Sequence, residues 1–185
     1  FILLYKFGDA VLTVMKIPFF LELGFSNTEI GTIAKLVGFP PIIIGGLFGG
    51  LLLAKTGIMR GLLISGIFMA ASNLVFVLQS WVGYSQEMLA VTIAIENFTT
   101  SMGTVAFVAY LSSLCNIAYT ATQYALLTSF MAFSRTVMTS GSGWVADQVS
   151  WPVFFMLTTL AALPGLILLV YMIRRFDQAP VQSPD

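Results

Sequence analysis

The chain has 185 residues, of which 58% are hydrophobic and 9% charged, and eight Lys and Arg balance eight Asp and Glu. A mean hydropathy of +0.94 lies well above that of ordinary soluble domains, and zero net charge argues against a nucleic-acid partner. Histidine is absent and Cys115 is the single cysteine, which excludes His-ligated metals and an intrachain disulfide. We therefore expect neither a metal nor a cofactor.

Six long apolar runs follow one another along nearly the whole chain. A helix of about 20 apolar residues crosses a bilayer core of about 30 Å, so each run predicts a transmembrane helix. The predicted spans cover residues 2–24, 29–54, 60–80, 88–114, 122–146 and 151–173. The sequence thus predicts an all-α polytopic membrane protein, with a six-helix domain over residues 1–175 and a short tail over residues 176–185.

The first residue is Phe1, within an apolar run, rather than Met. We therefore expect the chain to be a fragment or a truncated form of a longer protein.

Basic residues near the span ends predict the orientation. Lys55 and Arg60 flank the seam between the second and third spans, and Arg174 and Arg175 follow the last span. The seams on the other side carry Asn, Gln, Asp and Glu but no Lys or Arg. Because Lys and Arg accumulate on the cytoplasmic side, this seam and both termini, including the tail, are expected to be cytoplasmic.

The first three spans resemble the last three in their polar residues. Spans one and four each carry a carboxylate within a polar stripe of helical spacing, namely Asp9 and Glu96. Spans two and five both become glycine-rich before an Ala followed by a charged residue. Matching helices in two triplets predict two inverted three-helix repeats.

Glu22 sits close enough to a span end to be interfacial. Away from the span ends, six charged residues fall inside the predicted spans, where each costs about 2.5–3.5 kcal/mol near a helix centre if it faces lipid. They are Lys6, Asp9, Lys16, Lys35, Glu96 and Arg135. One interpretation is internal ion pairs that fix helix packing, with Asp9 paired to Lys6 or Lys16 and Glu96 to Arg135. Lys6 has the further alternative of extending to the cytoplasmic headgroups. The interpretation that we favour is a solute or proton pathway.

The balance of these charges predicts the kind of solute. Four cations face two carboxylates, which leaves two positive charges in the expected cavity and favours an anionic solute. Asn97 is a further candidate for hydrogen bonds to sugar or peptide groups. Asp9 and Glu96 are the two deep carboxylates, so they are the candidates for carrying a coupled proton.

Several segments resemble the AmpG-type muropeptide permeases of the major facilitator superfamily. The most specific are residues 110–116 (YLSSLCN) and 121–127 (ATQYALL), together with the opening FILLYKFGDA of residues 1–10. Residues 95–97, 102–109 and 163–169 fit the same pattern, and the resemblance extends to residue 175.

This resemblance implies the C-terminal six helices of a twelve-helix transporter, with the N-terminal six-helix half as its partner. It also implies proton-coupled import of anhydromuropeptides, which are anionic sugar-peptides, across the bacterial inner membrane for peptidoglycan recycling. Such a permease is not an enzyme.

The loop between the second and third spans departs from the superfamily pattern Gly-x-x-x-Asp-Arg/Lys-x-Gly. Here it reads Gly50-Leu-Leu-Leu-Ala54-Lys55-Thr56-Gly57, so Ala54 replaces the Asp and a gating salt bridge through that carboxylate is in doubt. Residues expected to act in helix packing or gating are Gly45, Gly46, Gly49, Gly50, Lys55, Gly57 and Arg60. For the four glycines of the second span, packing through small-xxx-small pairs is the expected role.

Two other functions fit the same sequence. One is a facilitator for another solute, such as acetyl-CoA or a drug. The other is a truncated membrane protein that does not transport.

Overall fold

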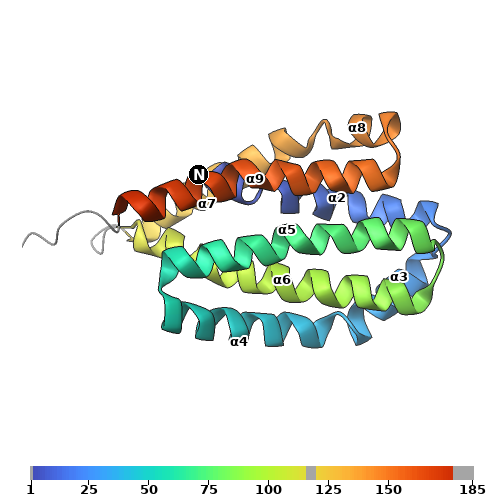
Figure 1. Cartoon of the computed structure of the whole chain (residues 1–185), viewed down its shortest axis with the longest axis horizontal. Coiled ribbons are helices and arrows are strands. Elements are labelled where there is room, and N and C mark those ends of the chain that lie inside the picture. The colour runs from blue at the N-terminus through green and yellow to red at the C-terminus, as the bar shows by residue number, and fades with distance from the viewer. Residues whose placement is uncertain (1, 116–119, 177–185) are drawn as a thin grey trace, which may run out of the picture.

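The computed structural model of the chain describes residues 2–115 and 120–176, and over these residues it is helical and contains no strand. The helices are α1 (Ile2–Tyr5), α2 (Phe7–Glu22), α3 (Asn27–Leu36), α4 (Phe39–Thr56), α5 (Ile58–Val82), α6 (Gln86–Ser113), α7 (Thr120–Thr139), α8 (Ser142–Gln148) and α9 (Trp151–Phe176). They run along a common direction, with α4 and α7–α8 on opposite sides of the bundle (Figure 1). The all-α prediction is confirmed. Residues 177–185 of the predicted tail lie outside the described residues.

Local sequence signals explain where several helices begin. The Ser26 hydroxyl accepts a hydrogen bond from the backbone N–H of Glu29, and the Glu29 carboxylate accepts one from the Ser26 N–H, which forms a capping box at the start of α3. At the start of α6 the Ser85 hydroxyl accepts a hydrogen bond from the backbone N–H of Met88, which caps the helix without a reciprocal bond. Gly57, with a φ of +80°, is the one residue between α4 and α5, in a conformation that favours glycine.

The second predicted span differs from expectation because it is broken between α3 and α4. Pro40 and Pro41, in the first turn of α4, have no N–H to donate to the preceding turn, so a continuous helix would leave carbonyl groups there without partners. The carbonyl oxygen of Gly38, at the break, instead accepts a hydrogen bond from the Asn97 side chain at 3.0 Å.

The first and fifth predicted spans are also interrupted. A turn at Lys6 separates α1 from α2, although the Ala10 N–H still donates to the Lys6 carbonyl at 2.9 Å. In the fifth span, α7 ends at Thr139 and α8 begins at Ser142. The hydroxyls of Ser140 and Ser142 donate to the carbonyls of Val137 and Thr139, each at 2.7 Å, and such bonds compete with the helical pattern.

Among the described residues, four helices are long and apolar enough to cross a membrane, namely α4, α5, α6 and α9. α2 has 16 residues, and α7 contains many Thr, Ser and Gln side chains in addition to Arg135. The six-span count therefore stays a prediction.

The helices pack around two apolar clusters. α6 lies against α4 and α5, and α5 against α9. One cluster contains Phe19, Phe20, Phe76 and Phe155, whose rings lie 4.8–6.2 Å apart where they pair. The other cluster contains Tyr5, Phe107 and their neighbours, and there the Tyr5 hydroxyl donates to the Leu62 carbonyl at 3.0 Å.

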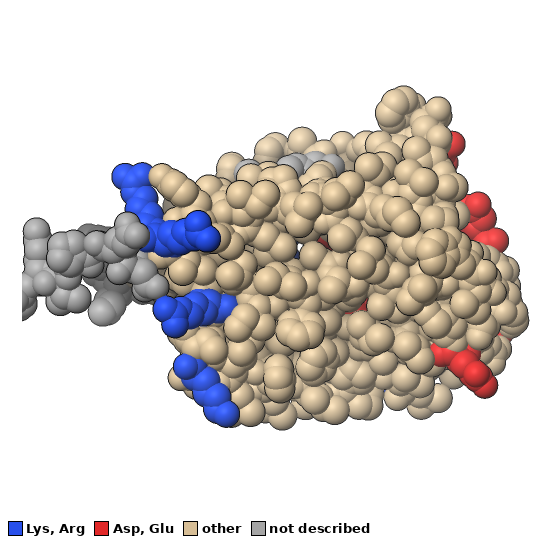
Figure 2. Space-filling view, in the orientation of Figure 1, with Lys and Arg blue, Asp and Glu red and all other residues tan. Residues whose placement is uncertain are grey.

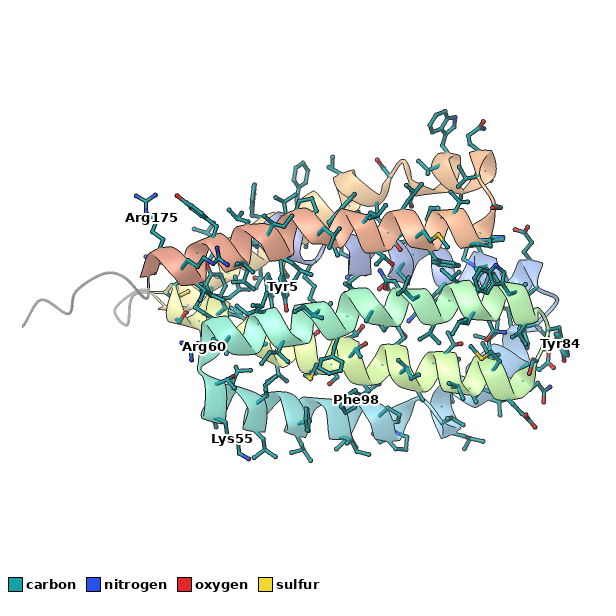
Figure 3. All side chains as sticks on the ribbon, in the orientation of Figure 1. Tyr5, Lys55, Arg60, Tyr84, Phe98 and Arg175 are labelled. Carbon is teal, nitrogen blue, oxygen red and sulfur yellow. The ribbon has the colours of Figure 1, made fainter. Side chains whose placement is uncertain are left out.

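Charged side chains gather at the two ends of the bundle and are sparse on the surface between them (Figure 2). Lys55, Arg60 and Arg175 lie at one end, and Tyr84 lies at the other (Figure 3). The Tyr84 hydroxyl donates a hydrogen bond to the Glu29 carboxylate at that end. The other carboxylates of the seams without Lys or Arg, Glu87 and Asp147, are exposed. One end is thus basic and the opposite end acidic.

Candidate functional site

A polar contact joins the first and fourth predicted spans in the cytoplasmic half expected from the sequence. The Lys6 ammonium lies 3.3 Å from the Asp9 carboxylate and donates to the Thr104 hydroxyl at 3.1 Å. The other Asp9 oxygen accepts a hydrogen bond from the Thr100 hydroxyl at 3.0 Å. Asp9 and Lys6 are therefore held together and are each also bonded to α6.

An ion pair joins α2 and α6 further along these two helices. The Lys16 ammonium lies 2.9 and 3.0 Å from the two Glu96 carboxylate oxygens. The Glu96 side chain is 5% exposed, so the pair neutralises a charge that would otherwise be costly in this place.

These contacts decide among the pairings considered from the sequence. Asp9 pairs with Lys6 rather than Lys16, because seven residues on one helix are separated by about 10 Å at 1.5 Å per residue. The alternative pairing of Glu96 with Arg135 is wrong, because Glu96 pairs with Lys16 of α2. The Lys6 ammonium bonds to Asp9 and Thr104, so its side chain does not extend to the cytoplasmic headgroups as the other alternative predicted.

A cavity of about 530 Å³ opens beside the Lys6–Asp9 pair, between α1–α2, α6 and α7. Its polar and charged lining residues are Lys6, Asp9, Thr104, Tyr124, Thr128, Arg135 and Thr136. Phe107, Val108, Leu111 and Met131 supply apolar walls. The cavity can therefore receive a solute with both anionic and apolar groups.

The remaining predicted site residues are not all brought together. Arg135 is exposed on α7 and lines the cavity, whereas Lys35 is exposed in the last turn of α3 and does not line it. Asn97 donates to the Gly38 carbonyl at the break between α3 and α4, so its amide group is already used for a structural contact.

The predicted packing glycines have different surroundings. Gly45 and Gly49 are buried against the backbone of α6, where an added Cβ at Gly49 would lie 3.0 Å from the Met102 carbonyl oxygen. A Cβ at Gly46 would meet the Ser101 hydroxyl at 3.3 Å, and one at Gly50 would meet open space. Lys55, Gly57 and Arg60 lie at the exposed seam between α4 and α5.

Several residues around the cavity were not predicted from the sequence. Thr104 lies one turn beyond Thr100 on the polar stripe of α6, so helical spacing was a signal that could have found it. Tyr124 and Thr128 of α7 also line the cavity, but an isolated Tyr or Thr in a helix gives no comparable signal. Within the described residues, no group of His, Cys, Asp or Glu is arranged to hold a metal ion.

A second hollow of about 670 Å³ lies near the acidic end, between α2, α8 and the start of α9. It is lined by Glu22, Asp147 and Trp151, among others. Glu22 was interpreted from the sequence as an interfacial residue, and its side chain is exposed there.

The helical bundle, the apolar spans and the charged cavity define a polytopic membrane protein of the transporter type. The Major Facilitator Superfamily model matches residues 2–184, and the chain belongs to this family. It is 38% identical over 176 residues to AmpG 4 of Rickettsia felis, which covers 95% of this chain and 42% of that protein. It is also 38% identical over 170 residues to the anhydromuropeptide permease of Escherichia coli K12, which covers 91% of this chain and 35% of that protein. The chain thus spans about two fifths of the length of these curated relatives.

Proposed function

We propose that the chain is the C-terminal half of a proton-coupled transporter that imports anhydromuropeptides across the bacterial inner membrane. Membership of the Major Facilitator Superfamily and the name of the Escherichia coli relative support this proposal. The share of the relatives that the chain covers supports a missing partner half, which would supply the first six helices. The transporter makes and breaks no covalent bond.

The observation that carries the proposal is the cavity between α2, α6 and α7, because it combines a carboxylate with cations and apolar walls. Lys6 and Asp9 neutralise each other in its lining, and Arg135 adds a positive charge from α7. Lys16 and Glu96 also neutralise each other, which leaves Lys35 and Arg135 as the surplus cations of the predicted spans. A surplus positive charge favours a solute that carries carboxylates.

The segregated charges support an orientation for this transporter. The end with Lys55, Arg60, Arg174 and Arg175 would face the cytoplasm, and the end with Glu29 and Tyr84 would face the periplasm. Both termini would then be cytoplasmic. The six spans would form two inverted repeats of three helices, with the solute pathway between this half and its partner.

Asp9 and Glu96 are the candidates for the coupled proton, and Lys35 and Arg135 for attraction of the anionic solute. The test uses the intact transporter that contains this chain, reconstituted in vesicles with radiolabelled anhydromuropeptide. Asp9→Asn or Glu96→Gln should abolish accumulation driven by the proton gradient, but should leave counterflow exchange, which needs no net proton movement.

Arg135→Gln should instead weaken solute binding in both assays, on the order of tenfold if one charge-assisted hydrogen bond is lost. Lys35→Gln, outside the cavity, should weaken the attraction of the anionic solute in both assays. If both carboxylate variants still accumulate solute against its gradient, the coupling residue lies elsewhere in the transporter. If acetyl-CoA or a drug is taken up and anhydromuropeptide is not, the alternative solute class is correct. If no solute is taken up, the non-transporting alternative is favoured.

A further inference from the structure

The ion pair between Lys6 and Asp9, at the start of α2, and the ion pair between Lys16 of α2 and Glu96 of α6 differ in how closely their charged atoms meet. Lys16 contacts both oxygens of Glu96 at 2.9 and 3.0 Å, and neither residue lines a described cavity. Lys6 contacts only one Asp9 oxygen, at 3.3 Å, and both residues line the cavity of about 530 Å³. The Lys6–Asp9 pair is therefore the one that a solute can reach.

Each member of the accessible pair has a second partner on α6. Lys6 also donates to Thr104 at 3.1 Å, and Asp9 also accepts from Thr100 at 3.0 Å. Because these bonds go to different residues, the ion pair can separate while each side chain keeps a hydrogen bond. The contact is thus built so that its opening leaves neither group without a partner.

We propose that a carboxylate of the incoming solute replaces Asp9 on the Lys6 ammonium, and that the released Asp9 carboxylate takes up one proton. This inference rests on the proposed transport function and deepens it, since it assigns solute recognition and proton uptake to one pair of residues. The solute class is an organic anion with at least one free carboxylate.

The exchange balances in charge and atoms. Before binding, the pair consists of one ammonium and one carboxylate, and the solute brings a second carboxylate. After binding, the ammonium faces the solute carboxylate, and Asp9 carries the proton taken from water as a neutral acid. The charge of the lining pair and its bound anion together is zero, as it was for the pair before binding, so no uncompensated charge remains in the cavity.

The other groups around Asp9 are compatible with this exchange. Lys6 and Thr100 bond to the Asp9 carboxylate, and Tyr5 and Glu96 interact with it electrostatically. Polar residues that share its cavities include Thr104 of α6, Tyr124 and Arg135 of α7, and Asn73 of α5. α9 packs on α2 and has no charged residue before Arg174. Glu96, the other carboxylate, is bonded to Lys16, so Asp9 is the carboxylate free to exchange its partner.

The experiment measures proton uptake when solute binds to the intact transporter that contains this chain, purified in detergent. Binding heats of anhydromuropeptide in buffers of different ionisation enthalpy give the number of protons taken up per solute. We expect about one proton for the unmodified transporter, and by linkage the Kd should rise about tenfold per pH unit wherever one proton is taken up per solute. An analogue with its carboxylates amidated should bind without proton uptake.

Variants assign the effect to the pair. Asp9→Asn should bind solute with no proton uptake and a Kd independent of pH, whereas Glu22→Gln, an exposed carboxylate on the same helix, should keep the uptake of one proton. Lys6→Gln should lose the preference for the free carboxylate over the amide, and Lys6→Arg should restore it.

Proton uptake that persists in Asp9→Asn, or equal uptake for the acid and the amide, would overturn the exchange. The comparison of acid with amide needs no variant, so it decides the matter even if Asp9→Asn does not fold. Solute binding without proton uptake, in a transporter that still accumulates solute under a proton gradient, would overturn this inference alone. A complete lack of binding would overturn the proposed function as well.

Discussion

Gly45 and Gly50 lie five residues apart on α4 but have different surroundings. Gly45 is buried, and a Cβ there would overlap the Phe98 carbonyl oxygen, while a Cβ at Gly50 would meet open space. The Phe98 side chain lies beside α4, where its ring is 5.9 Å from that of Phe48 (Figure 3). The two glycines are therefore a matched pair for testing how closely α4 and α6 approach.

We predict that Gly45→Ala destabilises the protein and that Gly50→Ala does not. Both substitutions raise intrinsic helix stability by about 1 kcal/mol, but at Gly45 the added methyl group forces the backbones apart, at a typical cost of about 1–3 kcal/mol. The free energy of unfolding in mixed detergent micelles measures the difference. Equal shifts for the two variants would show that α4 and α6 are not in close contact at Gly45.

Glu29 lies in the first turn of α3, outside the four described helices that are long and apolar enough to cross a membrane, and its hydrogen bonds allow a second prediction. Hydrogen bonds from the Tyr84 hydroxyl, the Ser26 backbone and side chain, and Gln86 lower the pKa of Glu29 from 4.5 to about 2. A carboxyl group whose pKa is lower in the folded state stabilises the fold above its unfolded pKa, and this stabilisation is lost as the pH falls towards the folded value.

The thermal stability of the unmodified protein should therefore exceed that of Glu29→Gln at pH 7, with the difference shrinking as the pH falls from about 4.5 to about 2. Glu87→Gln, at the same end of the bundle, serves as the control. A difference in melting temperature that stays constant across this pH range would contradict the hydrogen-bonded carboxylate.

Charged residues of the predicted spans could be identified from the sequence, but their partners could not all be chosen. Lys6 and Asp9 are three residues apart, which is about one helical turn, so their pairing could be predicted from the spacing. The pairing of Glu96 with Lys16, 80 residues away, depends on how α2 and α6 are rotated about their axes. No local pattern in one sequence contains that rotation, so Arg135 was an equally plausible partner for Glu96.

The break between α3 and α4 shows the same limit at the scale of elements. Pro40 and Pro41 stand next to each other in the second predicted span, and a proline inside a helix kinks or breaks it. The sequence did not show that the helix stops altogether, because the Gly38 carbonyl at the break is bonded to Asn97, 59 residues away. The break in the fifth span lacks a proline, and the Ser and Thr hydroxyls that accompany it are common in continuous helices as well.

We predict that Asn97→Leu loosens α3. The Gly38 carbonyl would lose its donor, and an unsatisfied, partly buried acceptor costs about 1–3 kcal/mol. Amide hydrogen exchange over residues 27–36 should therefore become on the order of tenfold faster. Ser101→Ala is the matched control, because the Ser101 hydroxyl donates to the Ile42 carbonyl beyond the break, so its loss should affect α4. Unchanged exchange in α3 of the Asn97 variant would contradict this role.

At the scale of the whole molecule, composition and the long apolar runs were enough to predict an all-α membrane protein, because most of the described residues lie in helices and four of these helices are long and apolar. The resemblance carried by residues 110–116 and 121–127 led to the same superfamily as the family comparison. The cavity could not be predicted, since it depends on the positions of α2, α6 and α7 relative to one another.

The separation of charges predicts the topology of the molecule. Lys55, Arg60 and Arg175 share one end, and Tyr84 marks the other (Figure 3). Reporter fusions after Asp185 and within residues 80–87 should therefore report opposite sides of the membrane, with the first on the cytoplasmic side. Fusions that report the same side would contradict the predicted orientation.

The central claim is that this chain is one half of a proton-driven importer of anionic sugar-peptides. Its most direct test is uptake of radiolabelled anhydromuropeptide into proteoliposomes under an imposed inward proton gradient. We predict accumulation by the intact transporter that contains this chain, loss of accumulation when the gradient is collapsed, and no uptake by the 185-residue chain alone. Uptake by the intact transporter that is unaffected by the gradient, or no uptake at all, would contradict the claim.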